Sequence, residues 1–239
     1  MSDRLPSITC SSHTAGLGDY WTDTYERAWD SISQVEQMMP FVHVDTPTFA
    51  PGTKFQYSNS GFILAGAIIQ KMASADYFDY VREHIYRPLG MTETDSYLKL
   101  SSDTTLAEPL SKGKTGWVEA SHGLRGSSAG GGYSTPRDML RFMRGLKNGT
   151  VLKESSVAEM ITPKNSGLED KFPYGYGFTL GLKGQRVVSY GHGGQAPGIN
   201  FEARYFPEVD VTFIIFSNQD SGAYDDLKKN IEKLITGDR

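Results

Sequence analysis

The chain has 239 residues, a formal net charge of −4 and 38% apolar residues, which suits a soluble protein with one sizeable core. The mild acidity, without a basic cluster, argues against a nucleic-acid-binding surface. A single cysteine, Cys10, excludes an intrachain disulfide, and no apolar run is long enough to predict a membrane span.

Hydrophobic periodicity predicts helices early in the chain and strands late. The expected helices cover residues 23–39, 61–72, 76–86, 134–146 and 224–235. The expected strands cover residues 174–182, 185–190, 201–206 and 211–216. This order predicts an α+β protein with an antiparallel sheet backed by helices. We expect a single domain, mostly helical and loop-rich over 1–165, with the strands and the last helix in 166–239.

Tyr57, Ser58 and Asn59 stand directly before the helix expected at 61–72, which is apolar nearly all round and is predicted to be buried. Asn59 or Ser60 can cap that helix. A tyrosine serves as a general base only where cations or a helix N-terminus favour the phenolate, and this position supplies the helix dipole. The alternative is a turn tyrosine beside an N-cap.

His192, Gly193 and Gly194 lie between two predicted strands. The glycines allow a ligand to lie against the strand edge, and the following backbone N–H, that of Gln195, can donate to an oxyanion. A histidine with an ordinary pKa of about 6.5 is mostly neutral at pH 7 and binds a carboxylate weakly there. An isolated histidine among glycines is otherwise usually a turn residue.

In this order and setting, the two motifs resemble the second and third active-site elements of the β-lactamase-related serine hydrolases. This group joins class C β-lactamases, D-alanyl-D-alanine peptidases and β-lactamase-like carboxylesterases. Further segments that resemble the family lie at residues 12–17, 87–91 and 132–139. The resemblance implies a β-lactamase/transpeptidase-like fold with a helical subdomain, and acyl transfer in which a serine attacks an ester or amide carbonyl.

The resemblance also implies roles for five residues. Tyr57 would be the base, and Asn59 would bind the substrate or hold a lysine. His192 and Gly194 would contact the substrate, and Gln195 would be the oxyanion donor. No cofactor is implied, and the histidines lack the spacing of metal ligands.

The first element of the family, a helical Ser-x-x-Lys that carries the nucleophile, should precede Tyr57, and residues 1–56 contain none. We therefore expect the N-terminal part of the family fold to be missing. Ser96 and Ser111 fit the pattern with Lys99 and Lys114, but both follow Tyr57 in strand or loop settings. The segment 126–130 fits a nucleophile elbow, yet no strand precedes it.

The sequence thus predicts a β-lactamase-related serine hydrolase, esterase-like rather than a β-lactamase, that is weakly active or inactive as written. The alternative is a non-catalytic binding or scaffold protein that keeps the cleft. The expected ligand is a small-molecule ester or amide, with no nucleic acid and no membrane. A homo-oligomer is expected through the surface left by the missing part, because an unpaired strand edge invites another strand. Residues 1–6 lack an apolar signal, so the chain as written is predicted to be cytoplasmic, unless a longer parent carries an export signal.

Overall fold

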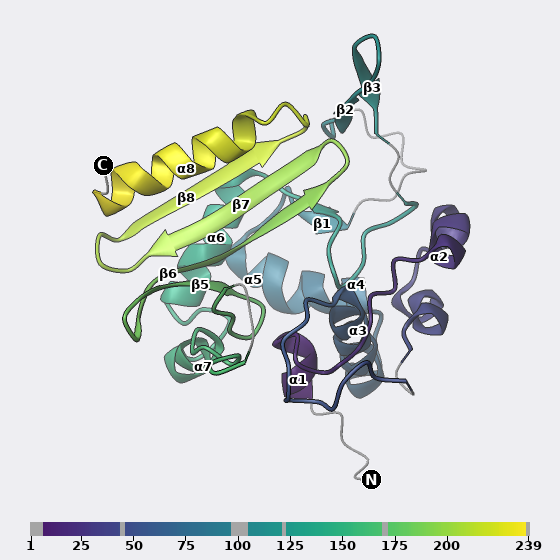
Figure 1. Cartoon of the computed structure of the whole chain (residues 1–239), viewed down its shortest axis with the longest axis horizontal. Coiled ribbons are helices and arrows are strands. Elements are labelled where there is room, and N and C mark those ends of the chain that lie inside the picture. Colours follow the sequence, from purple (N-terminus) through teal and green to yellow (C-terminus); the bar gives the residue numbers. More distant parts are fainter. Residues whose placement is uncertain (1–6, 44–45, 97–104, 121–122, 169–171, 238–239) are drawn as a thin grey trace.

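The computed structural model describes residues 7–43, 46–96, 105–120, 123–168 and 172–237 (Figure 1). Its centre is a four-stranded antiparallel sheet in the order β5-β6-β7-β8. The strands are β5 (Thr179–Lys183), β6 (Arg186–Ala196), β7 (Ile199–Phe206) and β8 (Val211–Ser217). Two short pairs lie apart from it: β1 (Asp95–Ser96) with β4 (Gly132–Tyr133), and β2 (Leu110–Lys112) with β3 (Trp117–Glu119). The predicted α+β class and antiparallel sheet are confirmed.

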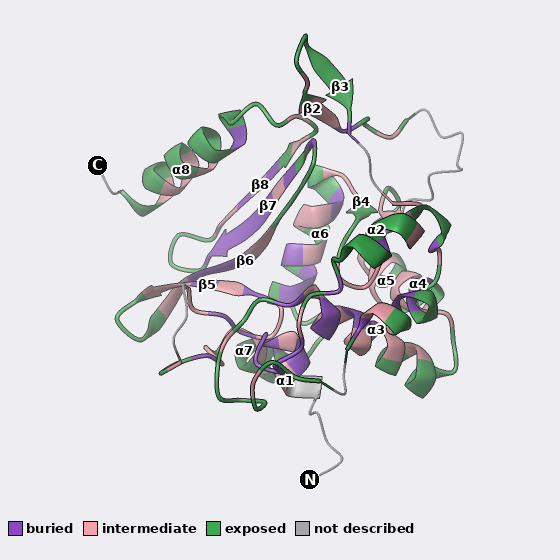
Figure 2. Cartoon of the chain, turned by 45° about the vertical axis from the view of Figure 1, so that its right-hand side comes forward, coloured by how far each residue is buried: buried purple, intermediate pink, exposed green. Residues whose placement is uncertain are grey.

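Helices cover both faces of this sheet, α6 (Pro136–Lys147) on one and α8 (Ala223–Thr236) on the other (Figure 1). Side chains alternate along β7 accordingly: Ala203 and Tyr205 pack in the core under α6, and Phe206 packs under α8. Figure 2 shows the buried residues gathered in β6, β7 and the inner side of α6.

The remaining helices form the helical part beside the sheet. They are α1 (Ser7–Ser11), α2 (Asp23–Ala28), α3 (Asn59–Ala73), α4 (Tyr77–Val81), the π-helical turn η3 (Arg82–Tyr86), α5 (Arg87–Leu89) and α7 (Glu154–Met160). Two 3₁₀ segments, η1 (Trp29–Ser31) and η2 (Val35–Phe41), follow α2. In the part of the chain described, no helix is both long and apolar enough to cross a membrane.

The continuous helix predicted for 23–39 is wrong, because α2 ends at Ala28 and 3₁₀ turns replace the rest. Side chains there bond to the backbone and compete with helical bonding. The Ser31 hydroxyl donates to the carbonyl of Ala28, and the Gln37 side chain accepts the N–H groups of Ser33 and Gln34.

The helix predicted at 61–72 exists as α3, but it is not buried all round. Ile63 and Gly66 are buried, whereas Met72 is 81% exposed because the last turns project beyond the segments that cover the first ones. Its N-cap is Ser58 rather than Asn59 or Ser60.

Other boundaries also differ from the prediction. The helix expected at 76–86 is divided into α4 and η3, with Asp76 as its N-cap. Helix α7 was not predicted at all, since no strong periodicity marks it. Strand β5 starts five residues later than expected, at Thr179, and β6 continues to Ala196, so that His192 lies within a strand.

Candidate active site

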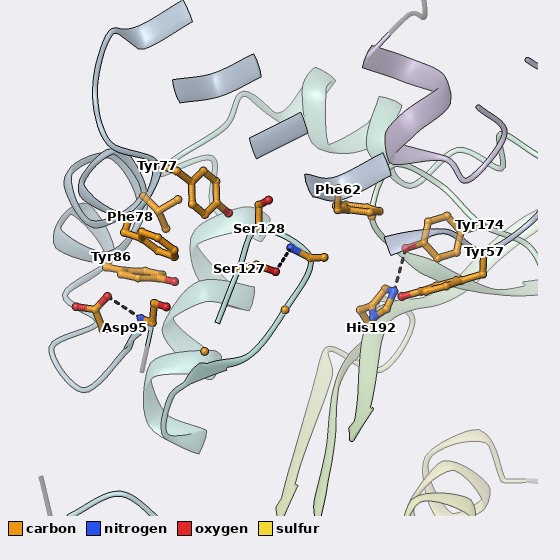
Figure 3. A pocket seen from close by; sticks show the side chains of 16 residues that line it. Tyr57, Phe62, Tyr77, Phe78, Tyr86, Asp95, Ser127, Ser128, Tyr174 and His192 are labelled. Carbon is orange, nitrogen blue, oxygen red and sulfur yellow. Dashed lines mark hydrogen bonds between the residues drawn. The ribbon is translucent and has the colours of Figure 1, made fainter. Parts of the chain in front are cut away.

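A cavity of about 310 Å³ lies between the helical part and the sheet (Figure 3). Tyr57, Tyr174 and His192 line one end of it, and the ring centroids of Tyr57 and His192 are 6.4 Å apart. The structure therefore brings together two of the residues singled out in the sequence, one ahead of α3 and one in β6.

Tyr57 is 42% exposed and rests on a buried histidine, His13. The two rings are 4.0 Å apart at an interplanar angle of 31°. The Nδ1 atom of His13 accepts the backbone N–H of Ser58 at 3.0 Å, which fixes the segment that carries Tyr57. His13 itself has a left-handed backbone, with φ of 58°. Sequence reasoning gave His13 no role beyond architecture.

The surroundings of Tyr57 favour the neutral phenol. Burial raises its pKa, and the Asp19 carboxylate raises it further. Both influences oppose the phenolate that the helix dipole was expected to stabilise. Tyr57 in this structure is a proton donor at neutral pH, and a cation beside it would be needed to make it a base.

Asn59 is held by Asp19, a residue that the sequence did not single out. Its Nδ2 donates to the Asp19 carboxylate at 2.9 Å, and its backbone N–H approaches the same oxygen at 3.4 Å. This carboxylate at the start of α3 also complements the helix dipole. Asn59 is not among the residues that line the cavity.

His192 is a neutral imidazole whose two ring nitrogens are both hydrogen-bonded. Its Nδ1 lies 2.5 Å from the carbonyl oxygen of Gly193, and its Nε2 lies 2.9 Å from the Tyr174 hydroxyl. A carbonyl only accepts, so Nδ1 carries the proton and Tyr174 donates to Nε2. Burial lowers the pKa of His192, in keeping with the neutral form. The ring therefore offers a ligand no positive charge.

The two glycines after His192 have different surroundings. A Cβ on Gly193 would meet the Glu202 carboxylate at 2.6 Å, whereas a Cβ on Gly194 would meet nothing within 4 Å. Pairing of β6 with β5 ends at Gly191, so beyond it this edge of β6 is open in the described part of the chain. Gly194 is thus the glycine that leaves room for a ligand.

Gln195 lies further along β6 and is exposed. It lines a second hollow of about 430 Å³ instead of the cavity at Tyr57. The structure thus separates the Gln195 side chain from Tyr57 and His192. An oxyanion contact from this residue would come from its backbone.

The serines considered as nucleophiles have other surroundings. Ser111 lies in β2, and its hydroxyl donates to Asp220 at 2.8 Å. Lys99, the partner of Ser96 in the pattern, lies outside the described residues. Ser127 and Ser128 line the cavity, in a turn closed by backbone hydrogen bonds between Ser127 and Gly130 and not in a strand-to-helix elbow. Among the described residues, no group of three or more His, Cys, Asp and Glu could hold a metal ion.

We expect the buried His13 to make the fold sensitive to acid. Burial and the nearby His192 lower its pKa to about 4, whereas an unfolded chain takes up the proton near 6.5. Between these values the unfolded state binds more protons, so stability falls with falling pH, by about 3 kcal/mol in all. Urea unfolding at several pH values between 7.5 and 4 measures this loss.

The variant His13→Gln removes the titrating group and should flatten that pH dependence. His84→Gln, at an exposed histidine, is the matched control and should leave it unchanged. A pH dependence in His13→Gln as steep as that of the parent would contradict the assignment.

The chain matches the family model described as Beta-lactamase over residues 11–237. A penicillin-binding protein of Bacillus subtilis is 24% identical over 229 residues, covering 87% of this chain and 50% of that protein. A D-aminopeptidase of Brucella anthropi is 24% identical over 237 residues, covering 94% of this chain and 44% of that protein. The chain thus spans half or less of the length of these relatives.

Among solved structures, a penicillin-binding protein from Bacillus halodurans superimposes with a TM-score of 0.85 and 26% identity. That match covers 98% of this chain and 74% of the other. The family model matches nearly the whole of this chain, and the solved structure has the same fold. The chain therefore belongs to the β-lactamase family of serine hydrolases and has the β-lactamase/transpeptidase-like fold.

Proposed function

We propose that the chain forms the part of an acyl-transfer site that binds uncharged esters or amides. The observation that carries this proposal is the neutral His192, locked by Tyr174 at the same end of the cavity as Tyr57. Because His192 carries no positive charge, its motif gives little affinity for the carboxylate of a β-lactam or peptide. An ester or amide that lacks such a carboxylate does not need a cation at this position, so the proposed site is esterase-like.

In this proposal the carbonyl of the ligand lies between Tyr57 and the open edge of β6. Gly194 leaves the space, the backbone N–H of Gln195 donates to the carbonyl oxygen, and His192 contacts the ligand through its ring. Asn59, held by Asp19 at the start of α3 and outside the cavity lining, supports the Tyr57 segment in this proposal. Tyr57, as a phenol, can donate a hydrogen bond to the leaving-group atom of the ligand, and it would accept a proton from a nucleophile only with a cation beside it.

The family's acyl transfer also needs the serine of a helical Ser-x-x-Lys, and residues 1–56 contain none. We therefore propose that the protein of this sequence is weakly active or inactive. A second candidate function, a non-catalytic binding or scaffold protein, is favoured by the raised pKa of Tyr57 and by the fully bonded imidazole of His192.

Binding of two small matched ligands tests the proposal. We expect N-methylacetamide to shift the ¹H–¹⁵N NMR signals of Gly194 and Gln195, and acetate to leave them in place. In the variant His192→Lys, acetate should gain binding, because a lysine restores the cation. Shifts centred away from the cavity, or equal binding of acetate by the parent, would contradict it.

We also propose self-association through β8, the last strand of the sheet. Its outer edge has no strand partner among the described residues, and Phe216 on it is 40% exposed. Light scattering should give a mass that rises with concentration, and Phe216→Lys should give a monomer, because lysine on an edge strand opposes pairing. A monomer at every concentration in the parent would rule this out.

A further inference from the structure

The cavity continues well beyond Tyr57 and His192. Its far end, here called the distal compartment, is lined by Tyr77, Phe78, Val81, Tyr86 and Ser127. Figure 3 shows the rings of Tyr77, Phe78 and Tyr86 gathered on the side opposite Tyr57, with the serines between the two ends. A ligand held by its carbonyl at Tyr57 would extend a substituent toward these rings.

The π-helical turn η3 builds this compartment. In a continuous α-helix, a step of about 100° per residue would place Tyr86 roughly half a turn away from Tyr77 and bring Ile85 to the cavity side instead. A π-helix has more residues per turn, and Tyr86 lines the cavity while Ile85 does not. Such turns are rare and are found frequently at functional sites.

Among the described residues that line the cavity, the charged side chain is Asp95, whose carboxylate is paired with Arg82 at 2.7 Å. The Arg125 guanidinium lies 3.6 Å from the centroid of the Phe78 ring but does not line the cavity. Burial raises the pKa of Tyr77, and it raises that of Tyr86 to about 12, so both phenols are neutral. A charged substituent would lose its hydration here without gaining a partner, whereas an uncharged aromatic ring would gain stacking contacts.

Hydroxyl groups supply a polar function within these aromatic walls. The hydroxyls of Tyr77 and Tyr86 point toward the middle of the pocket (Figure 3). The Ser127 oxygen accepts the N–H of Ala129 at 3.2 Å, and its side chain also hydrogen-bonds Tyr20, so the Tyr77 and Tyr86 hydroxyls are the groups that face a ligand. The neighbouring Ser128 Oγ is buried and finds no hydrogen-bond partner within the described residues.

We propose that the distal compartment binds an uncharged aromatic ring of the substrate that carries a hydrogen-bonding group such as a hydroxyl. The proposal rests on the function proposed above, which places the carbonyl at Tyr57. The expected substrates are esters and amides with a phenol-like substituent. Tyr77, Phe78, Val81 and Tyr86 are then the residues that determine specificity.

The test compares two neutral amides by NMR titration, N-methylacetamide and N-(4-hydroxyphenethyl)acetamide. The second carries the ring and should bind at least about tenfold more tightly, the effect of 1.4 kcal/mol. An analogue with a carboxylate on the ring in place of the hydroxyl should bind no better than N-methylacetamide. Val81→Phe fills the compartment and should remove the tenfold advantage while leaving N-methylacetamide binding unchanged.

Val118→Phe, on the exposed β3 strand, is the matched control and should change neither affinity. Tyr86→Phe, a milder change, should reduce the preference for the hydroxylated ring over its phenethyl analogue. Equal affinity for both amides, or a tighter binding of the ring-bearing amide that persists in Val81→Phe, would contradict the role of the distal compartment. Neither result would contradict the proposed function. If neither amide binds, both proposals fail.

Discussion

Purified protein is expected to hydrolyse p-nitrophenyl acetate, p-nitrophenyl butyrate and nitrocefin at rates close to those in buffer alone. The reason is the nucleophile, since no Ser-x-x-Lys precedes Tyr57 in the sequence. Loss of the nucleophile in a well-studied serine hydrolase lowers kcat by about 10⁶ and leaves only binding and oxyanion stabilisation. The raised pKa of Tyr57 removes a base as well. Spectrophotometric rates, measured beside an active serine hydrolase at equal concentration, give the result.

A fluorophosphonate label reacts with activated serines, so it distinguishes a weakly active nucleophilic serine from the absence of one. We expect no stoichiometric labelling of the chain. The serines to examine are Ser111, whose hydroxyl is engaged by Asp220, and Ser128, which lines the cavity. Labelling of one serine per chain that Ser128→Ala or Ser111→Ala abolishes would show a relocated nucleophile and defeat this prediction.

The sheet and the residues at the mouth of α3 could be predicted because their signals are local. Alternating apolar residues mark β7, a nearly continuous apolar run marks β8, and the start of α3 follows a polar capping segment at Ser58. His192 and Tyr57 were placed in one site by resemblance alone. Nothing in the spacing of two residues so far apart in the sequence predicts that their rings come within 6.4 Å.

What could not be predicted depends on contacts between distant segments. His13 supports Tyr57 through a ring contact and a bond to Ser58 across 45 residues. Asp19 holds Asn59 across 40 residues. The partner of His192 is a buried tyrosine, Tyr174, on another segment. The π-helical turn η3 likewise cannot be predicted from a 3.6-residue period, because that period predicts one continuous α-helix.

Replacement of Glu202 by glutamine is expected to lower the free energy of unfolding by about 3–5 kcal/mol. Glu202 lies in β7 and is only 1% exposed. Its Oε1 accepts the Nε of Arg204 at 3.0 Å, and its Oε2 accepts the Nζ of Lys228 at 2.7 Å. A neutral amide leaves the Lys228 ammonium without its carboxylate, and it leaves the largely buried Arg204 guanidinium with only the longer ion-pair contact to Glu232 at 3.6 Å. Thermal melting should show a drop of roughly 6–20 °C for a chain of this size.

Glu208→Gln is the matched control, because Glu208 forms an ion pair with Arg186 at the surface and should cost less than about 1 kcal/mol. Loss of the Glu202 carboxylate should also disturb the candidate active site, because this carboxylate packs against Gly193. The double variant Glu202→Gln with Lys228→Met, which removes one of the orphaned cations, should regain part of the stability. A Glu202→Gln variant that melts within 2 °C of the parent would show that the ion pairs of Glu202 contribute little to stability, and would contradict this prediction.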